Sequence, residues 1–212
     1  MLDKCELTAF VGVIGSGKDY QCQKLRQEGF TQINFADSLR DLAWHIFGWK
    51  PKDANEYELF KKKEWILDLP ETIDVYSSTD QKTTLEGDIP PHVEMSGRLF
   101  LQRLGDGARN IINDLAWVRA FEHKLFTLRD QGHKKFCVSD LRYANEFAAV
   151  RNLPKIIPGL QVRVVFTDYR SDRYNATDPH PSEKLAQEFL ATGSYKDLDT
   201  IYLSPEIRLK EK

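Results

Sequence analysis

The sequence is poor in cysteine, has no long apolar run and begins with charged residues. Its three cysteines, Cys5, Cys22 and Cys137, are odd in number and show no CxxC spacing, which argues against a disulfide framework and a zinc site. No stretch approaches the ~18 consecutive apolar residues that a membrane-spanning helix requires. The charges among the first six residues do not suit a secretion signal. We therefore expect a cytoplasmic protein with no membrane partner.

The sequence also lacks an excess of charge of either sign. Thirty Lys and Arg residues face 32 Asp and Glu residues, which leaves a net charge of -2. A protein that binds duplexes generally would show a basic excess, so stable nucleic-acid binding is not expected. A small phosphorylated ligand held by a few placed arginines is compatible with this balance. The 212 residues, of which 41% are hydrophobic, suit one globular domain with an insertion.

Apolar, β-branched segments alternate with segments of helical period along most of the chain. This alternation predicts an α/β fold with a mostly parallel sheet in a single domain over residues 1–212. Residues 49–95 hold several prolines and show no clean period, and we expect them to form an insertion with short helices. The helix predicted from Ser96 places Leu101, Leu104, Ala108 and Ile111 on one face. Strands are predicted at 7–13, 31–35, 136–139, 162–167 and 200–203, and further helices at 18–28, 39–46, 118–131, 144–151 and 182–190.

A glycine-rich segment joins the first predicted strand to the first predicted helix. Residues 12–18 read Gly-Val-Ile-Gly-Ser-Gly-Lys and fit the pattern G-x-x-x-x-G-K in the context that this motif requires. Glycines let the backbone N–H groups point inward at phosphate oxygens, and the helix N-terminus adds partial positive charge. The alternative is a glycine-rich turn with a solvent-facing lysine. The motif predicts phosphate contacts from Gly12, Gly15, Ser16, Gly17 and Lys18, with Lys18 on the β- and γ-phosphates.

The position after the lysine bears on magnesium. It is usually Ser or Thr, whose hydroxyl binds Mg²⁺, but here it is Asp19, followed by Tyr20. The Asp19 carboxylate could hold Mg²⁺ through water, or it could face away and cap the helix. We expect Mg²⁺ and leave its protein ligand open.

Arginines elsewhere can supply the positive charge that phosphoryl transfer needs. Arg40 follows the second predicted strand, and Arg98 and Arg109 lie three helical turns apart, so both could face one cleft. Asp140 and Arg142 follow the strand at 136–139, at the carboxyl end where open parallel sheets bind ligands. Asp140 would bind Mg²⁺ through water or fix an arginine. For any single arginine the alternative is a solvated helix face.

Residues 168–181 follow the fourth predicted strand and are strongly polar. Arg170 and Arg173 lie within this segment. A mobile lid that screens the γ-phosphoryl charge is one interpretation, and an ordinary surface loop is the other. No pattern places a nucleophilic side chain beside a base.

Four segments together resemble the deoxynucleoside monophosphate kinases of tailed bacteriophages, a branch of the P-loop nucleoside monophosphate kinases. Asp at position 19 is usual in that family, whereas Thr is common where this chain has Tyr20. The resemblance covers roughly residues 7–203. The segments are Gly12 to Asp19; Phe35-Ala36-Asp37-Ser38-Leu39-Arg40; Arg98 to Arg109 followed by Trp117; and Asp140-Leu141-Arg142-Tyr143-Ala144-Asn145-Glu146 with His180-Pro181-Ser182-Glu183 downstream.

The resemblance implies transfer of the γ-phosphoryl group of ATP to a deoxynucleoside 5′-monophosphate, giving ADP and the diphosphate, with Mg²⁺. It implies a five-stranded parallel sheet of order 2-3-1-4-5, closure of the 49–95 insertion over the acceptor and of a lid at 168–181 over ATP, and a homodimer in the host cytoplasm. No general base is needed, because a monophosphate oxygen is already a nucleophile. The site assignment comprises Lys18, Asp140, Arg142, Arg170 and Arg173 for catalysis, Asp19 and Asp140 for Mg²⁺, and Arg40, Arg98, Gln102, Arg109, Arg142 and Glu146 for the acceptor.

Two alternatives stay open on the sequence alone. One is another small-molecule P-loop kinase, such as a dephospho-coenzyme A kinase. The other is a non-catalytic nucleotide-binding or regulatory protein.

Overall fold

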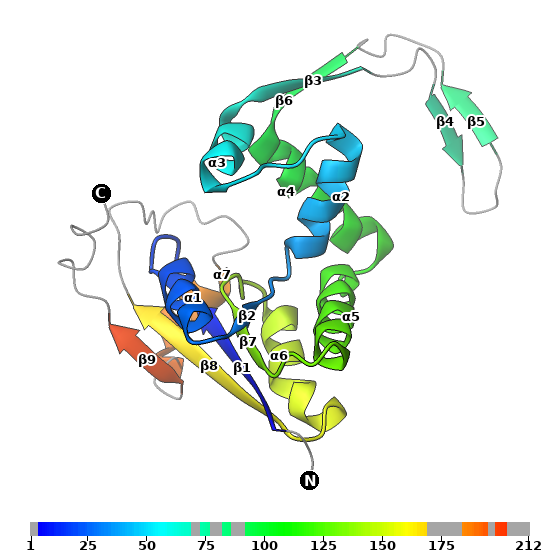
Figure 1. Cartoon of the computed structure of the whole chain (residues 1–212). Helices are drawn as coiled ribbons and strands as arrows, with labels where there is room; N and C mark the ends of the chain where they lie inside the picture. Colours follow the sequence, from blue (N-terminus) through cyan, green and yellow to red (C-terminus); the bar gives the residue numbers. More distant parts are fainter. Residues whose placement is uncertain are drawn as a thin grey trace. The chain divides into compact units, whose positions relative to one another are not determined.

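The computed structural model describes residues 4–68, 73–76, 82–85, 92–168, 184–194 and 198–202 (Figure 1). At 66–68, 73–76, 82–85, 92–93, 168 and 200–202 it describes the backbone alone. The chain divides into two compact units. Unit 1 comprises Met1–Ser38 and Ile112–Lys212, and unit 2 comprises Leu39–Ile111. Unit 2 therefore contains the whole 49–95 segment together with residues on both sides of it. None of the described helices is both long and apolar enough to cross a membrane.

Unit 1 is built on one parallel sheet. Its strands lie in the order β2-β7-β1-β8-β9, and every neighbouring pair is parallel. The central strand, β1, pairs with β8 along its whole length, from Cys5 opposite Leu160 to Val11 opposite Phe166. The prediction of an α/β fold with a parallel sheet is confirmed. The strands are β1 (Cys5–Val11), β2 (Thr31–Gln32), β7 (Lys135–Val138), β8 (Leu160–Asp168) and β9 (Asp199–Tyr202).

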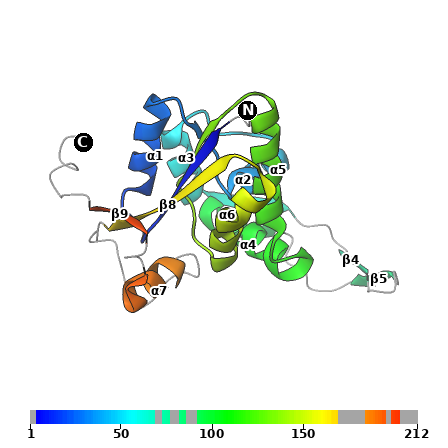
Figure 2. The same cartoon turned by 90° about the horizontal axis from the view of Figure 1, so that it is seen from below.

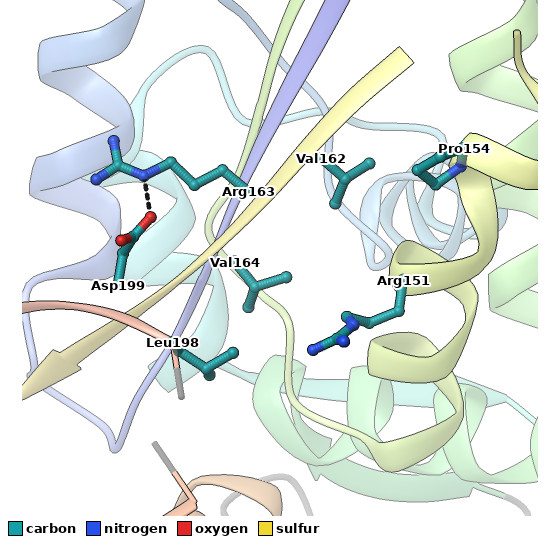
Figure 3. Close-up of a pocket in the computed structure, with 7 residues that line it drawn as sticks. All are labelled: Arg151, Pro154, Val162, Arg163, Val164, Leu198 and Asp199. Carbon is teal, nitrogen blue, oxygen red and sulfur yellow. Dashed lines mark hydrogen bonds and ion pairs between the residues drawn. The ribbon is translucent and has the colours of Figure 1, made fainter. Parts of the chain in front are cut away.

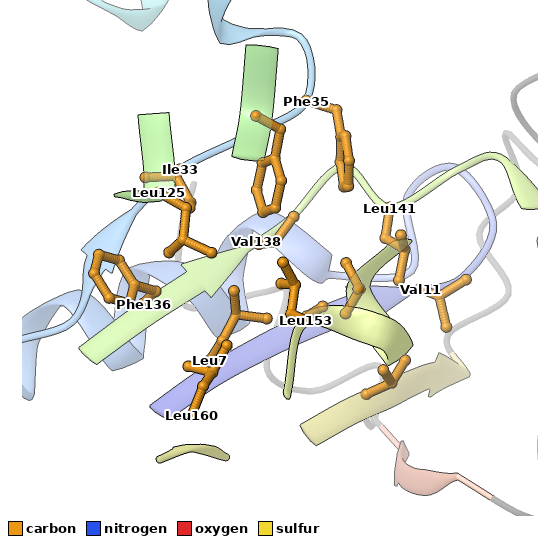
Figure 4. Packing of buried hydrophobic residues seen from close by; sticks show 14 of the residues in the cluster. Leu7, Val11, Ile33, Phe35, Leu125, Phe136, Val138, Leu141, Leu153 and Leu160 are labelled. Atoms are coloured by element: carbon orange, nitrogen blue, oxygen red, sulfur yellow. The ribbon is translucent and has the colours of Figure 1, made fainter. Parts of the chain in front are cut away.

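Helices cover both faces of this sheet because side chains alternate along each strand. Leu7 and Val11 of β1 pack with α5 and α6 in the larger core cluster, part of which Figure 4 shows. Phe10 points to the other face and packs with Cys22 of α1. Figure 2 shows α1 on one side of β1 and β8, and α5 and α6 on the other. These helices are α1 (Lys18–Gln27), α5 (Ala116–Asp130) and α6 (Ala144–Ile156); α7 (Lys184–Thr192) adds Leu185 to the larger cluster.

Two element boundaries differ from the prediction for identifiable reasons. The second strand, predicted to reach residue 35, ends at Gln32. The Ile33 N–H still donates to the carbonyl oxygen of Cys137, but the backbone N–H groups after it bond to side chains. Asn34 N–H donates to the Asp37 carboxylate, and Phe35 N–H donates to Asp140. The helix predicted to end at 151 continues through Pro154 to Ile156, and its late residue Leu153 is fully buried in the core.

Unit 2 packs three helices around an aromatic cluster. Trp44 and Phe60 lie edge to face with ring centres 5.0 Å apart, and Phe47, Trp65 and Phe100 pack around them. Among the described residues, the short helices expected at 49–95 amount to α3 alone, and antiparallel strands make up the rest. The elements are α2 (Asp37–Phe47), α3 (Ala54–Lys62), β3 (Glu64–Asp68), β4 (Ile73–Tyr76), β5 (Lys82–Leu85), β6 (His92–Ser96) and α4 (Gly97–Gly107), with β3 paired to β6 and β4 to β5.

A π-helical turn, η1 (Ala108–Ile112), follows α4 and changes the helical register. Leu101 is buried, whereas Ile111 is 84% exposed, so the prediction that the two residues share one helical face is wrong. A π-helical turn holds more residues than an α-helical turn and therefore rotates the residues after it. Arg109 lies within this π-helical turn.

Candidate functional site

The parallel strands of unit 1 bring several polar residues to one edge of the sheet. β1 ends at the glycine-rich loop, Ser139 and Asp140 directly follow β7, and Thr167 lies near the end of β8. Ligands of open parallel sheets bind outside the carboxyl ends of the strands. This edge is therefore the candidate site. All of these residues belong to unit 1.

The glycine-rich loop joins β1 to α1 in the context predicted for it. Gly15 and Gly17 have φ angles of 74° and 84°, in the left-handed region that favours glycine. Gly12 is required for a different reason. A Cβ atom there would lie 2.5 Å from the hydroxyl oxygen of Ser16 and 2.5 Å from both the carbonyl and the hydroxyl oxygen of Thr167. The structure thus explains each glycine of the motif, two by their backbone conformation and Gly12 by its close contacts.

Lys18, the first residue of α1, lies inside the loop. Its side chain is 7% exposed, and its ammonium donates to the carbonyl oxygens of Gly12 at 2.6 Å and Val13 at 2.8 Å. The Ser16 hydroxyl lies 3.4 Å from the same nitrogen. A buried ammonium requires such partners. The alternative of a solvent-facing lysine does not describe this loop, whose cationic group sits beside the N-terminus of a helix.

Thr167, on the neighbouring strand β8, contacts the glycine-rich loop. Its side chain and that of Ser16 are fully buried, and their hydroxyl oxygens are 2.7 Å apart. The Thr167 hydroxyl also donates to the carbonyl oxygen of Val11 at 3.2 Å. Thr167 is not among the residues predicted from the sequence. The only signal there is a threonine at the end of the apolar run Val-Arg-Val-Val-Phe-Thr.

Asp140 ties the end of β7 to the loop after β2. Its two carboxylate oxygens accept hydrogen bonds from the N–H groups of Phe35 at 2.9 Å and Ala36 at 3.0 Å. Ser139 adds to this tie, because its N–H and hydroxyl both donate to the side-chain oxygen of Asn34. Asp140 is 8% exposed. The structure thus shows a bracing role for this carboxylate, and its predicted contact with Mg²⁺ stays a prediction.

Glu146 performs a similar task at the start of α6. It is 2% exposed, and one of its oxygens accepts from the backbone N–H groups of Arg142 at 2.9 Å and Tyr143 at 3.1 Å. The half-buried Arg142 is therefore carried on a backbone that Glu146 holds in place. The structure thus shows Glu146 supporting the backbone of Arg142, and its predicted contact with the acceptor stays a prediction.

The two predicted magnesium ligands differ in exposure. Asp19 is exposed in the first turn of α1, directly after Lys18, whereas Asp140 is buried. No group of three or more His, Cys, Asp or Glu side chains suited to a metal occurs in the described part of the chain. Mg²⁺ commonly uses one or two carboxylates and completes its shell with water and substrate phosphates. An exposed carboxylate beside a phosphate loop fits that pattern.

The remaining predicted site residues lie in unit 2 or outside the described residues. The Arg40 guanidinium carbon lies 5.7 Å from the centre of the Tyr57 ring, and a guanidinium nitrogen of Arg109 lies 4.0 Å from the Asp106 carboxylate. Arg98 is exposed and Gln102 is half-buried. Arg170 and Arg173, with residues 169–181 of the predicted lid, fall outside the described residues. The roles of all these residues stay predictions.

Two surface pockets of unit 1 lie away from the loop. The one in Figure 3 has a volume of about 330 Å³, and its Arg163 is paired with Asp199. The other, of about 510 Å³, lies beside β2 and includes Arg26 and Asp37. Neither pocket contains a residue of the 12–18 loop or any other predicted site residue. Loop geometry, and not pocket size, therefore marks the candidate site.

Comparisons with known proteins add little to this geometry. No protein-family model matches the chain, and no curated protein matches it. Among solved structures the chain is similar to one from Chloroflexus aurantiacus J-10-fl that is provisionally described as a kinase. The identity is 11%, the match covers 95% of this chain and 87% of that chain, and the TM-score is 0.45. So distant a similarity carries no functional conclusion.

Proposed function

We propose that the chain is a P-loop kinase that binds the phosphates of ATP at residues 12–18 of unit 1. The observation that supports this most is the position of Lys18, whose ammonium is held inside a glycine-rich strand–loop–helix turn. In such a turn the first N–H groups of the helix have no intrahelical partner and favour an anion. A lysine at the same place adds a full positive charge to them.

We further propose a deoxynucleoside 5′-monophosphate as the acceptor, with ADP and the diphosphate as products. This finer proposal rests on the four resembling segments and on the arginines that they contain. Arg142 in unit 1, and Arg40, Arg98, Gln102 and Arg109 in unit 2, are the proposed acceptor contacts. Glu146 acts through Arg142.

The chemistry asks little of the side chains beyond position and charge. The acceptor phosphate supplies its own nucleophilic oxygen, so no general base is required. Lys18 offsets charge on the β- and γ-phosphates, and Arg170 and Arg173 are proposed to offset charge on the transferring group. A bound Mg²⁺ would supply positive charge that offsets the charge of the phosphates. Asp19 is the proposed holder of that ion through water, with Asp140 as the second candidate.

An ADP-release assay tests the proposal. The purified protein is incubated with MgATP and, separately, each deoxynucleoside monophosphate, each ribonucleoside monophosphate and dephospho-coenzyme A. Transfer to one or more deoxynucleotides, absent in Lys18→Ala, supports it. Transfer to dephospho-coenzyme A alone would show a different small-molecule kinase. Nucleotide binding without turnover on any acceptor would show a regulatory protein.

A further inference from the structure

Thr167 joins two segments that lie far apart in the sequence. It stands near the end of β8, fully buried, and contacts the Ser16 hydroxyl at 2.7 Å and the Val11 carbonyl oxygen at 3.2 Å. Ser16 and Val11 belong to the loop and to the strand that leads into it. Three fully buried positions thus meet where β1 becomes the loop.

The direction of these hydrogen bonds follows from counting protons. A carbonyl oxygen only accepts, so the single hydroxyl proton of Thr167 is used on Val11. The Ser16 hydroxyl must therefore donate to Thr167. This leaves the lone pairs of Ser16 to accept from the Lys18 ammonium, which lies 3.4 Å away. A directed chain runs from Lys18 through Ser16 and Thr167 to Val11.

Thr167 also limits the start of the loop sterically. A Cβ atom on Gly12 would lie 2.5 Å from both the carbonyl and the hydroxyl oxygen of Thr167. Thr167 therefore packs against Gly12, the first glycine of the loop, and orients Ser16, which precedes the last glycine. These two restraints act on opposite ends of the phosphate-binding turn.

We infer that Thr167 is a positioning residue for nucleotide binding, because its hydroxyl fixes Ser16 and through it the loop that holds Lys18. This inference rests on the proposed function, since it assigns a role in binding a nucleoside triphosphate. Without the Thr167 hydroxyl, the buried Ser16 hydroxyl loses its acceptor and the loop must shift to find another. Thr167 touches neither phosphate nor acceptor on this account.

The test compares Thr167→Val, which keeps the shape and removes the hydroxyl, with Thr167→Ser, which keeps the hydroxyl. Thr8→Val is the matched control, because Thr8 is a buried threonine of the adjacent strand β1 whose hydroxyl takes no part in the loop's hydrogen bonds. We expect the Kd and KM for MgATP to rise about tenfold in Thr167→Val, as removal of one buried hydrogen bond predicts. Thr167→Ser and Thr8→Val should stay near the parent.

The split between KM and kcat separates positioning from a general loss of structure. Partial unfolding lowers the concentration of active protein and so the apparent kcat, while KM is unchanged. A double-mutant cycle with Ser16→Ala adds a second criterion: the two substitutions should be strongly non-additive in Kd, because both remove the same bond. Additive effects would contradict the inference.

Amide hydrogen exchange of residues 12–18 provides a readout that needs no activity. Exchange should be faster in Thr167→Val than in Thr167→Ser and Thr8→Val. If the parent protein binds no nucleoside triphosphate, the proposed function fails and the exchange data alone decide whether Thr167 holds the loop. If the parent binds MgATP and Thr167→Val matches it in Kd and exchange, the inference fails and the proposed function stands.

Discussion

The buried carboxylate of Glu146 accepts a hydrogen bond from the backbone N–H of Arg142, four residues earlier, at 2.9 Å. The same oxygen accepts from Tyr143, so one acid closes the turn between β7 and α6. Arg142 carries the positive side chain, and Glu146 holds the backbone on which Arg142 stands. Substitutions at the two positions should therefore differ in kind.

Glu146→Leu should lower stability by about 1–3 kcal/mol, because two part-buried backbone N–H groups lose their acceptor. Glu146→Gln retains a side-chain oxygen and should lower stability less. Urea unfolding followed by circular dichroism measures both changes. Equal stability of Glu146→Leu and the parent would show that this turn does not need its acid.

Arg142→Lys should instead leave stability nearly unchanged and weaken binding of the acceptor. A guanidinium grips phosphate with two parallel N–H groups, and an ammonium cannot. Removing one hydrogen bond to a charged phosphate in a closed site costs about 1–3 kcal/mol, which would appear in the kcat/KM of the acceptor. Kinetics that match the parent for every monophosphate would remove Arg142 from the acceptor site.

Lys18→Ala and Lys18→Met should both abolish phosphoryl transfer, because the charge acts on the phosphates that develop charge in the transition state. Lys18 is buried, so some loss of stability accompanies the substitution; Lys18→Met limits it by filling the space. Thermal unfolding distinguishes a folded, inactive variant from an unfolded one. Normal turnover in either variant would refute the assignment of the phosphate loop.

Gly12→Ala and Gly107→Ala should have opposite effects. The new methyl group at Gly12 would meet the Thr167 carbonyl oxygen at 2.5 Å, and backbone cannot yield cheaply. At Gly107, in α4, nothing lies within 4 Å of the added carbon, and alanine should stabilise the helix by about 1 kcal/mol. The unfolding free energies of the two variants measure this contrast. A neutral Gly12→Ala would mean that the loop relaxes away from β8.

The three thiols should resist a thiol reagent in the native protein and react on unfolding. Cys5, Cys22 and Cys137 are all buried. The hydrogen bond with Cys137, together with burial, raises the pKa of the Cys22 thiol. Titration with a chromogenic disulfide, with and without denaturant, measures the protection.

Deoxy acceptors should be preferred over ribo acceptors, whereas the base of the triphosphate should matter little. On the proposed function, the loop would contact the donor phosphates through N–H groups and Lys18, and such contacts ignore the base. A 2′-hydroxyl enclosed without a partner costs about 1–3 kcal/mol, which is about tenfold or more in kcat/KM. A matrix of donors and acceptors at equal magnesium measures this. Equal rates for ribo and deoxy acceptors would leave a general monophosphate kinase.

What the sequence by itself determined is local. The loop at 12–18, the glycine after α5 and the alternation of strands with helices depend on neighbouring residues, whose conformational preferences act within a few positions. Gly132, for example, follows the C-cap residue of α5 and has a φ of 96°, in the left-handed region that favours glycine after a helix. The π-helical turn that exposes Ile111 left no comparable local signal.

Only the tertiary structure decided what several polar side chains do. Thr167 meets Ser16 across 151 positions of sequence, and Asp140 meets the Phe35 N–H across 105. A buried hydroxyl or carboxylate takes the role of whichever donor or acceptor the folded chain brings to it, because leaving it unpaired is costly. Those partners are set by which strands are neighbours in the sheet. Residue type and spacing therefore located the candidate site, and strand pairing decided which of its residues support the phosphate loop and the backbone of Arg142.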